Sequence, residues 1–398
     1  MIKGEDIVCI SNTTWFGEYT KSTVQIVSRL AQHNRVIFVE YPFTVKDLIY
    51  SALGKQKSPI KRMLGISNRL NIIKIDKQTE IYHLVIPPVL PVDFIQNDNF
   101  FRFFFNMNVA VYQRQIKRVL RKLDIKNPII ITAYNPFYGL PLIGKLNEKL
   151  NVYYCYDGIG TRRHGKRIFP VDELFSKSVD AIITTSDYLN SQKLLMNPNS
   201  FVVKNGVDFL AFNAVAKKSV QTGNHRKKVG YIGSLDHRFD IDTVEYAVNK
   251  LKNVDFEFTG NLRNQQIRQR LEKYDNIRFR PAVDPSEVPA LLAGCDAGII
   301  PYLANEINKN IYPLKINEYF AVGAPIVMTP FAHLPEFKGL VSVSEGQEDF
   351  ARKIEWELNN DSAVKIQQRI EFAKSNSWDQ KADEFGEILQ KLINHGNH

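Results

Sequence analysis

Several patterns that mark specialised proteins are absent from this sequence. It contains only three cysteines, Cys9, Cys155 and Cys295, and each lies in or beside an apolar run. We therefore expect small buried thiols in a reducing cytoplasm, with neither a metal site nor a disulfide framework. No window is apolar over the length of a membrane span, and the N-terminus enters a strand pattern at once instead of a secretory signal. With 398 residues, two or three globular domains are expected.

Acidic residues are scarce in the first half of the chain. Residues 1–204 carry 28 Lys/Arg and 16 Asp/Glu, a net charge of +12, whereas residues 205–398 carry 24 and 26, a net charge of −2. The sequence has no nucleic-acid-binding motif. The basic half therefore predicts an acidic partner other than nucleic acid: anionic lipid headgroups, a phosphate-linked lipid or an acidic glycan.

One segment of that half has no acidic residue at all. Between Leu48 and Ile75 there are six basic residues, interleaved with apolar ones such as Ile49, Leu53 and Ile66. Such a segment can rest on an anionic membrane surface, and we favour that interpretation. The alternative is a solvated excursion without a partner, since the segment has no long amphipathic period. The six basic residues are Lys55, Lys57, Lys61, Arg62, Arg69 and Lys74.

The rest of the chain alternates between strand and helix patterns. A first series of buried strands is predicted at 6–11, 35–40, 128–133, 152–156 and 180–185, and a second series at 228–233, 255–260, 277–281 and 297–301. Such alternation predicts an α/β fold with two parallel sheets, whose ligands lie off the carboxyl ends of the strands. The polar stretch 211–227 is predicted to link the two.

Polar and aromatic side chains in the first series are candidates for function. Asp157 directly follows the strand 152–156, where a carboxylate can orient a reacting hydroxyl or act as a base. The basic loop 160–167 contains His164, which has no partner recognisable in the sequence, so we favour a histidine without a catalytic role. The aromatic cluster Phe100–Phe105 is predicted to be core or pocket wall rather than a lipid anchor.

A short helix with defined ends is predicted within Tyr312–Val327. Pro313 suits its first turn, Gly323 suits the left-handed position after its end, and Pro325 prevents its continuation. Lys315 and Glu318 share one face. A carboxylate can accept two ribose hydroxyls, while a lysine and the helix N-terminus attract a pyrophosphate. The spacing by itself favours an ordinary surface pair on an amphipathic helix.

The wider pattern around this helix resembles a known signature. Residues 313–326 read Pro-Leu-Lys-x-x-Glu-Tyr-x-Ala-x-Gly-x-Pro-Ile, which is similar to the donor-site signature of the GT-B glycosyltransferases of group 1. Four further pieces resemble that family and follow its order: Asn205–Asp208, Gly230–Gly233, Cys295–Pro301 and Asn376–Trp378. They cover the C-terminal half, whereas the N-terminal half resembles the family only in its β–α rhythm and a few loops.

The resemblance implies a GT-B fold, in which two Rossmann-like domains face each other across a cleft. The N-terminal acceptor domain would span residues 1–215, with a C-terminal helix at about 376–398 packing back on it. The donor domain would span residues 216–375.

The resemblance also assigns donor-binding roles to residues of this sequence. Glu318 would bind the ribose. The backbone of Gly233 and Ser234, together with Arg238, Lys315 and the helix start at Leu314, would bind the diphosphate and offset its charge as it leaves. We expect Arg238 and Lys315 to act in catalysis, beside Asp157.

Three further positions are expected to contact the donor. Gly17, in the loop after the first strand, would lie near the donor phosphates, although a plain turn glycine is an equal alternative. Val283 would contact the nucleobase through its backbone. Asn310 stands where many family members have the first glutamate of a Glu-x7-Glu motif, and it can still hydrogen-bond a sugar hydroxyl.

The implied activity is transfer of a sugar from a nucleotide-diphosphate sugar, with a UDP-sugar favoured. The expected acceptor is a hydroxyl of a lipid-linked or polysaccharide molecule in cell-surface glycan synthesis. Retention of anomeric configuration, no metal and no cofactor beyond the donor are expected, and the protein would be cytoplasmic or peripheral at the inner face of the plasma membrane. A sugar-nucleotide epimerase on the same fold and a non-catalytic sugar-nucleotide or glycan-binding protein are the alternatives.

Overall fold

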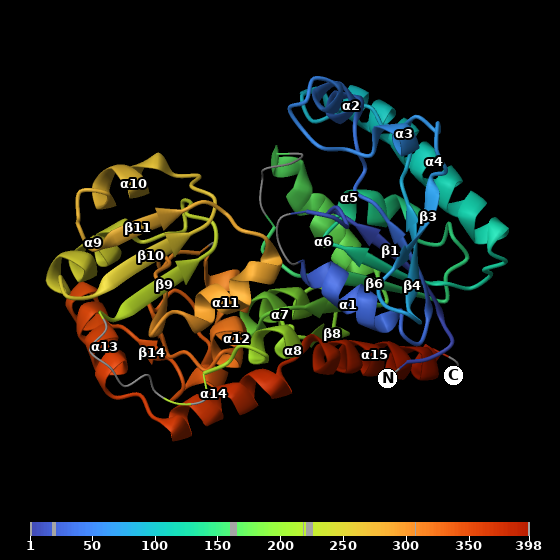
Figure 1. Cartoon of the computed structure of the whole chain (residues 1–398). Helices are drawn as coiled ribbons and strands as arrows, with labels where there is room; N and C mark the ends of the chain where they lie inside the picture. The colour runs from blue at the N-terminus through green and yellow to red at the C-terminus, as the bar shows by residue number, and fades with distance from the viewer. Residues whose placement is uncertain are drawn as a thin grey trace. The chain divides into compact units, whose positions relative to one another are not determined.

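The structure is a computed structural model that describes residues 2–17, 21–159, 165–217, 219, 226–306 and 308–396. The chain divides into two compact units, each built on its own sheet (Figure 1). Unit 1 comprises Met1–Lys204 and Ala382–His398, and unit 2 comprises Asn205–Lys381. In the described part of the chain, no helix combines the length and the apolar character needed to cross a membrane.

Unit 1 has an eight-stranded sheet in the order β3-β4-β2-β1-β5-β6-β7-β8, parallel except for the antiparallel pair β3–β4 at its edge. Because the other strands are parallel, their carboxyl ends meet at one edge of the sheet. The strands are β1 (Asp6–Ser11), β2 (Arg35–Val39), β3 (Leu70–Lys74), β4 (Glu80–Leu84), β5 (Ile129–Ala133), β6 (Leu150–Cys155), β7 (Ala181–Thr184) and β8 (Ser200–Val202).

The helices of unit 1 include α15, the C-terminal helix. Its Phe385 packs edge-on against Tyr154 of β6, with the ring centroids 5.4 Å apart. This apolar contact draws the end of the chain back to unit 1. The helices are α1 (Ser22–Leu30), α2 (Val45–Ala52), α3 (Ile60–Met63), α4 (Asp98–Lys122), α5 (Pro136–Gly139), α6 (Ile168–Ser178), α7 (Asp187–Leu194) and α15 (Trp378–Gly396).

The aromatic cluster at the start of α4 is divided between two environments. Phe101 and Phe105 are buried and their rings stack at 5.7 Å, as the core prediction requires. Phe100 and Phe103 are 63% and 62% exposed, so for them the prediction is wrong. The helical period separates the two pairs, because neighbouring residues on a helix point in different directions.

Unit 2 has a six-stranded, all-parallel sheet in the order β11-β10-β9-β12-β13-β14. Its strands are β9 (Lys228–Ile232), β10 (Asp255–Thr259), β11 (Ile277–Arg280), β12 (Ala297–Ile300), β13 (Ile326–Met328) and β14 (Ser342–Val343). Its helices are α8 (Phe209–Asn213), α9 (Ile241–Lys250), α10 (Gln265–Leu271), α11 (Val288–Ala293), α12 (Leu314–Ala321), α13 (Gln347–Asn359) and α14 (Ala363–Ser375).

The boundary between the units lies before the Asn205-Gly206 turn rather than near residue 215. Asn205 donates from its side-chain amide to the Tyr312 carbonyl at 3.0 Å, and the Asn317 amide donates back to the Asn205 carbonyl at 3.0 Å. Val207 pairs with Ser377 in a parallel bridge. These hydrogen bonds attach the turn to unit 2, in which α12 also lies.

Candidate active site

The helix α12 sets the geometry of the candidate site in unit 2. It begins at Leu314, directly after the extended Pro313, and in the described part of the chain no side chain caps its N-terminus. Gly323 has φ +78°, which confirms the predicted left-handed stop. Because Ile316 and Tyr319 are buried, Lys315 and Glu318 are turned away from the core. The uncapped first N–H groups can receive an anion.

Glu318 is a carboxylate without a protein partner. Among the residues that the structure describes, none donates a hydrogen bond to it or forms an ion pair with it. Its side chain is partly accessible, yet the surrounding protein desolvates the carboxyl group and raises its pKa, against the pull of Lys315. A desolvated, unpartnered carboxylate is costly to keep in a fold, so it indicates a group reserved for a ligand.

Two cations approach the buried phenol of Tyr302. The Lys315 ammonium donates to Tyr302 Oη at 3.2 Å, and the Arg238 guanidinium lies 5.5 Å from the centroid of the Tyr302 ring. Burial would raise the pKa of the Tyr302 phenol, but Lys315 and Arg238 outweigh it, and the pKa is lowered. The site therefore concentrates positive charge, as binding of a diphosphate requires.

Arg238 is held in place by its own loop. It forms a two-point contact with Asp236, Nε to Oδ1 at 2.9 Å and Nη2 to Oδ2 at 2.8 Å. Burial would raise the pKa of Asp236, but the hydrogen bonds from Arg238 lower it overall. The loop is bound to the segment after β12. The Leu303 N–H donates to the Arg238 carbonyl at 2.8 Å, and Phe239 forms an isolated antiparallel β-bridge with Tyr302.

The glycine turn after β9 lies against Lys315. A Cβ added to Gly233 would come within 2.6 Å of the Lys315 ammonium, so the Gly233 backbone and Lys315 border the same space. On its other side, a Cβ on Gly260 would lie 2.0 Å from the Gly233 carbonyl oxygen. Sequence reasoning singled out Gly233 but missed Gly260, whose partner is a backbone atom from a different strand end.

We expect Gly260→Ala to destabilise unit 2 by about 1–3 kcal/mol and to weaken nucleotide binding, because the methyl group must displace the Gly233 backbone. Urea unfolding and a nucleotide titration measure the two effects. Gly346→Ala is the matched control, since a Cβ there meets nothing within 4 Å. Equal stability of the two variants would contradict the close backbone approach.

The remaining unit 2 candidates lie around this centre. The Ser234 carbonyl accepts from the Tyr231 hydroxyl at 2.8 Å, in the turn after β9. Asn310 directly precedes the segment that leads into α12, and its amide donates to the Glu306 carbonyl at 2.9 Å. Val283 follows β11 at the edge of the sheet, separated from β9 by β10. The structure therefore gathers Gly233, Arg238, Lys315 and Glu318, and places Val283 farther along the same sheet edge.

One Asp-x-Asp spacing, Asp240 to Asp242, occurs beside Arg238, but both carboxylates are engaged. Asp240 caps α9 through the N–H and hydroxyl of Thr243, and Asp242 pairs with Arg270 at 2.7 Å. Across the described residues, no group of three or more His, Cys, Asp or Glu could hold a metal ion.

The unit 1 candidates lie at the carboxyl edge of its own sheet. Gly17 follows β1 and Asp157 follows β6, with β5 between those strands. Asp157 is exposed, and its Oδ1 accepts from the Gly158 N–H at 2.8 Å. His164 and residues 160–163 of its loop lie outside the described residues.

Unit 1 has a small recess of about 40 Å³ at this edge, where β1, β2 and β5 end. Its lining includes the amide side chains of Asn12, Asn108 and Asn135. The Asn108 amide is hydrogen-bonded to the backbone of Leu90, and the Asn135 amide donates to the Ser11 carbonyl at 3.3 Å, so these side chains hold the walls of the recess in place. A larger groove of about 820 Å³ lies at the opposite ends of β6 and β7, against α15, and none of the candidate residues lines it.

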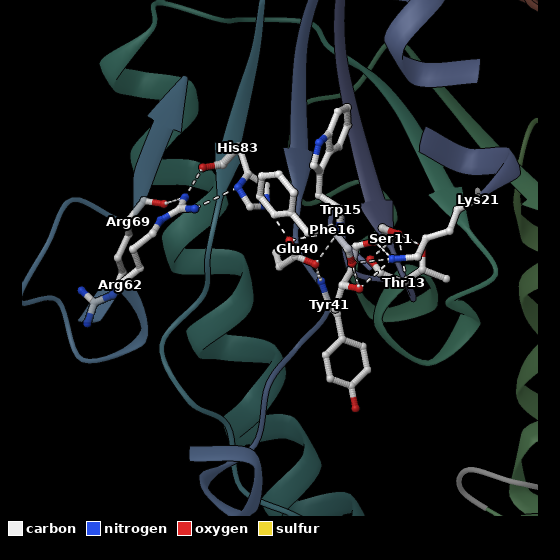
Figure 2. A network of polar contacts seen from close by, with 11 residues as sticks. Ser11, Thr13, Trp15, Phe16, Lys21, Glu40, Tyr41, Arg62, Arg69 and His83 are labelled. Atoms are coloured by element: carbon white, nitrogen blue, oxygen red, sulfur yellow. Dashed lines mark hydrogen bonds and ion pairs between the residues drawn. The ribbon is translucent and has the colours of Figure 1, made fainter. Parts of the chain in front are cut away.

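A buried hydrogen-bond network that sequence reasoning missed supports the loop after β1 (Figure 2). Glu40, directly after β2, lies 2.5 Å from Nε2 of His83 on β4, and its oxygens accept from the Trp15 N–H at 3.0 and 3.2 Å. Nδ1 of His83 lies 2.9 Å from Arg62 Nη1. Because an arginine only donates, Nδ1 is the acceptor and Nε2 carries the proton given to Glu40. This network holds Trp15 and hence the loop that leads to Gly17.

We expect Glu40→Gln to destabilise unit 1 by about 2–4 kcal/mol, because an amide cannot accept from both Trp15 and His83 while its own NH₂ finds a partner. Urea unfolding measures the change. Asp6→Asn is the control, since the Asp6–Arg35 pair is partly exposed and contributes about 1 kcal/mol or less. A similar loss of stability in both variants would contradict a special role of Glu40.

Comparison with known proteins identifies the class. Residues 226–360 match the family model of the glycosyl transferases group 1, so this part of the chain is similar to the domains of that family. The two parallel-sheet units have the fold of the GT-B glycosyltransferases. Both findings confirm the predicted fold and family.

Particular relatives agree with this class. The chain is 28% identical over 213 residues to the teichuronic acid biosynthesis glycosyltransferase TuaH of Bacillus subtilis (strain 168), a match that covers 48% of this chain and 54% of the relative. The match thus spans about half the length of that relative. Sucrose-phosphate synthase from Thermosynechococcus elongatus has a similar fold, with a TM-score of 0.70 at 14% identity over 98% of this chain and 100% of that one. An α,α-trehalose 6-phosphate synthase from Burkholderia multivorans gives 0.67 at 14% identity over 99% and 100%.

Proposed function

We propose that the protein transfers a sugar from a nucleotide-diphosphate sugar to a hydroxyl of a glycan or lipid-linked acceptor. The observation that carries the proposal is the pairing on α12 of Glu318, a carboxylate with no protein partner in the described residues, with Lys315 beside the Gly233 turn. A carboxylate and a cation three residues apart on one helix match a ribose diol and a diphosphate at the two ends of one nucleotide.

The leaving group would be stabilised by charge already in place. As the bond between the sugar and the diphosphate breaks, negative charge grows on the phosphate oxygens. Arg238, Lys315 and the first N–H groups of α12 would bind that charge without reorganising. On this basis we propose catalysis without a metal ion, with Asn310 near the sugar, Val283 near the base and Gly17 near the phosphates. A UDP-sugar is the favoured donor.

The acceptor would bind in unit 1. The amide-lined recess lies at the carboxyl ends of its strands, where ligands of parallel sheets bind. Asp157 would orient the acceptor hydroxyl or act as its base. The name of the TuaH relative and the +12 charge of residues 1–204 favour cell-surface glycan synthesis with a lipid-linked or anionic acceptor. We further propose retention of the anomeric configuration and action at the inner face of the plasma membrane.

A thermal-shift screen of the purified protein against UDP, GDP, ADP, CMP and dTDP, each with Mg²⁺ or with EDTA, tests the donor site. We expect one diphosphate to raise the melting temperature equally in both conditions. Stabilisation in Mg²⁺ alone would overturn the metal-free proposal. If no nucleotide stabilises the protein, the donor proposal fails. Proton NMR of the product's anomeric signal then tests retention.

A further inference from the structure

Helix α2 presents apolar side chains to solvent. All eight of its residues are described, and none is buried. The apolar Ile49 is 52% exposed, and Leu53, directly after the helix, is 62% exposed. Its start is well defined, because Thr44 and Asp47 form a reciprocal capping box. The exposed apolar residues therefore belong to a formed helix, which has a free face.

The segment after α2 continues this surface. α2 and α3 lie next to one another (Figure 1), and in the turn after α3 Leu64 is 50% and Ile66 72% exposed. Arg62 of α3 fixes the segment to the sheet, since its Nη2 donates to the carbonyls of Arg69 and His83 at 2.7 and 2.6 Å. This anchor keeps the apolar side chains outward rather than folded onto the core.

A second apolar stripe runs along α4. Phe100, Phe103, Met107 and Val111 are 63%, 62%, 48% and 37% exposed and recur at helical spacing, on a different face from the buried Phe101 and Phe105. A helix packed on one side needs no second apolar face for its own fold. The stripe is therefore available to a partner.

Hydrogen bonds connect the two surfaces. Val45 N–H at the start of α2 donates to the Val89 carbonyl at 2.9 Å, and the Asn108 side chain of α4 binds both the N–H and the carbonyl of Leu90. Thr44, Val89, Leu90 and Asn108 also line the recess of unit 1. The apolar surface thus borders the candidate acceptor site.

The charge of the surface indicates its partner. Lys55, Lys57 and Lys61 are exposed on it, and the segment from Leu48 to Ile75 contains no acidic residue, whereas Arg62 is turned inward as the anchor to the sheet. A second copy of the same surface would bring like charges together, whereas an anionic bilayer offers both negative headgroups and an apolar interior. We propose that α2, α3 with the turn to Ile66, and the exposed stripe of α4 form a docking surface for an anionic membrane.

Membrane docking deepens the proposed action at the inner face of the plasma membrane, but it does not depend on donor binding or sugar transfer. A lipid-linked acceptor would reach the recess from the bilayer without leaving it. Sedimentation of the full chain with vesicles of phosphatidylglycerol and phosphatidylcholine tests the docking. We expect binding to the mixed vesicles and none to pure phosphatidylcholine. We also expect release by 0.5 M salt, because the Debye length then falls to about 3–4 Å and the electrostatic attraction is screened.

Two sets of variants test the surface itself. Changing the exposed Lys55, Lys57 and Lys61 together to Gln is expected to weaken partitioning about 100-fold. The triple variant Ile49→Ser, Leu53→Ser, Phe103→Ser is expected to abolish sedimentation. Since all six side chains are exposed, the melting temperature is expected to stay unchanged.

Matched controls lie in unit 2. Lys250, Lys252 and Lys338 are exposed, and their joint change to Gln alters the net charge equally. If this control loses binding as much as the unit 1 variant, or if the wild type does not sediment, the docking surface is refuted. Nucleotide binding by the docking variants is read in parallel. Docking variants that retain it while losing sedimentation support membrane binding as a separate property, and loss of both refutes the assignment.

Discussion

Glu318→Gln is expected to raise the melting temperature at pH 7 and, at the same time, to weaken nucleotide binding about 100-fold. The two effects have one origin. The carboxylate is desolvated and has no partner among the described residues, so its charge destabilises the folded protein. The same carboxylate is the strong acceptor that two ribose hydroxyls need, and an amide oxygen is a weaker one.

The pH dependence follows from the direction of the pKa shift. The folded pKa of Glu318 lies above the ordinary value of 4.5, so the folded state binds the proton more tightly than the unfolded state. The stabilisation from this group is therefore present below the unfolded pKa and is lost as pH rises through the raised folded pKa. The gain in melting temperature of Glu318→Gln over the wild type should be largest at neutral pH and should vanish below about pH 4.5.

Differential scanning fluorimetry between pH 4 and pH 8, with calorimetric nucleotide titration, measures both effects. Glu355→Gln on α13 is the control, because Glu355 is an exposed carboxylate of the same unit. It should change neither quantity. A Glu318→Gln protein that is less stable than the wild type at pH 7, or that binds nucleotide normally, would contradict the proposed role of Glu318 in binding the ribose.

Removing either cation beside Tyr302 is expected to lower kcat about 100- to 1,000-fold, with a smaller effect on donor binding. Lys315→Met and Arg238→Met both remove charge that would neutralise the departing diphosphate. Arg238→Lys keeps the charge but cannot form the two-point contact with Asp236, so we expect it to recover only part of kcat.

Steady-state kinetics with a nucleotide sugar measures this effect through release of the nucleoside diphosphate. Lys338→Met is the control, because this exposed lysine belongs to unit 2 but not to the group around Tyr302. Lys315 also lowers the pKa of Tyr302, so ultraviolet titration of the phenol should give a higher pKa in Lys315→Met. Wild-type turnover in both cation variants would be incompatible with a diphosphate bound at this place.

Much of the site was predictable from local rules. Gly323 ends α12 because its φ of +78° suits a residue without a Cβ, and the 3.6-residue period puts Lys315 and Glu318 on the face away from Ile316. The apolar strand runs and the helices between them predicted both parallel sheets. Each of these features depends on residues close together in the chain, which is why the sequence determined them.

The environment of those residues was decided by the tertiary structure. Tyr302, Asp236 and Gly260 join the site because the loops after β9, β10 and β12 meet at one edge of the sheet, and no short-range pattern marks that meeting. The Glu40–His83 pair likewise depends on which strands are neighbours and on their register.

The surface of unit 1 likewise combines features that the sequence determined with features that only tertiary packing decided. The sequence determined that residues 48–75 are basic and that residues 100–105 are aromatic. Which aromatic side chains are buried depended on the rotation of α4 against its sheet, and that placed Phe101 inside and Phe103 outside. Long-range packing sets such rotations, because only contacts between distant segments distinguish one apolar face of a helix from another.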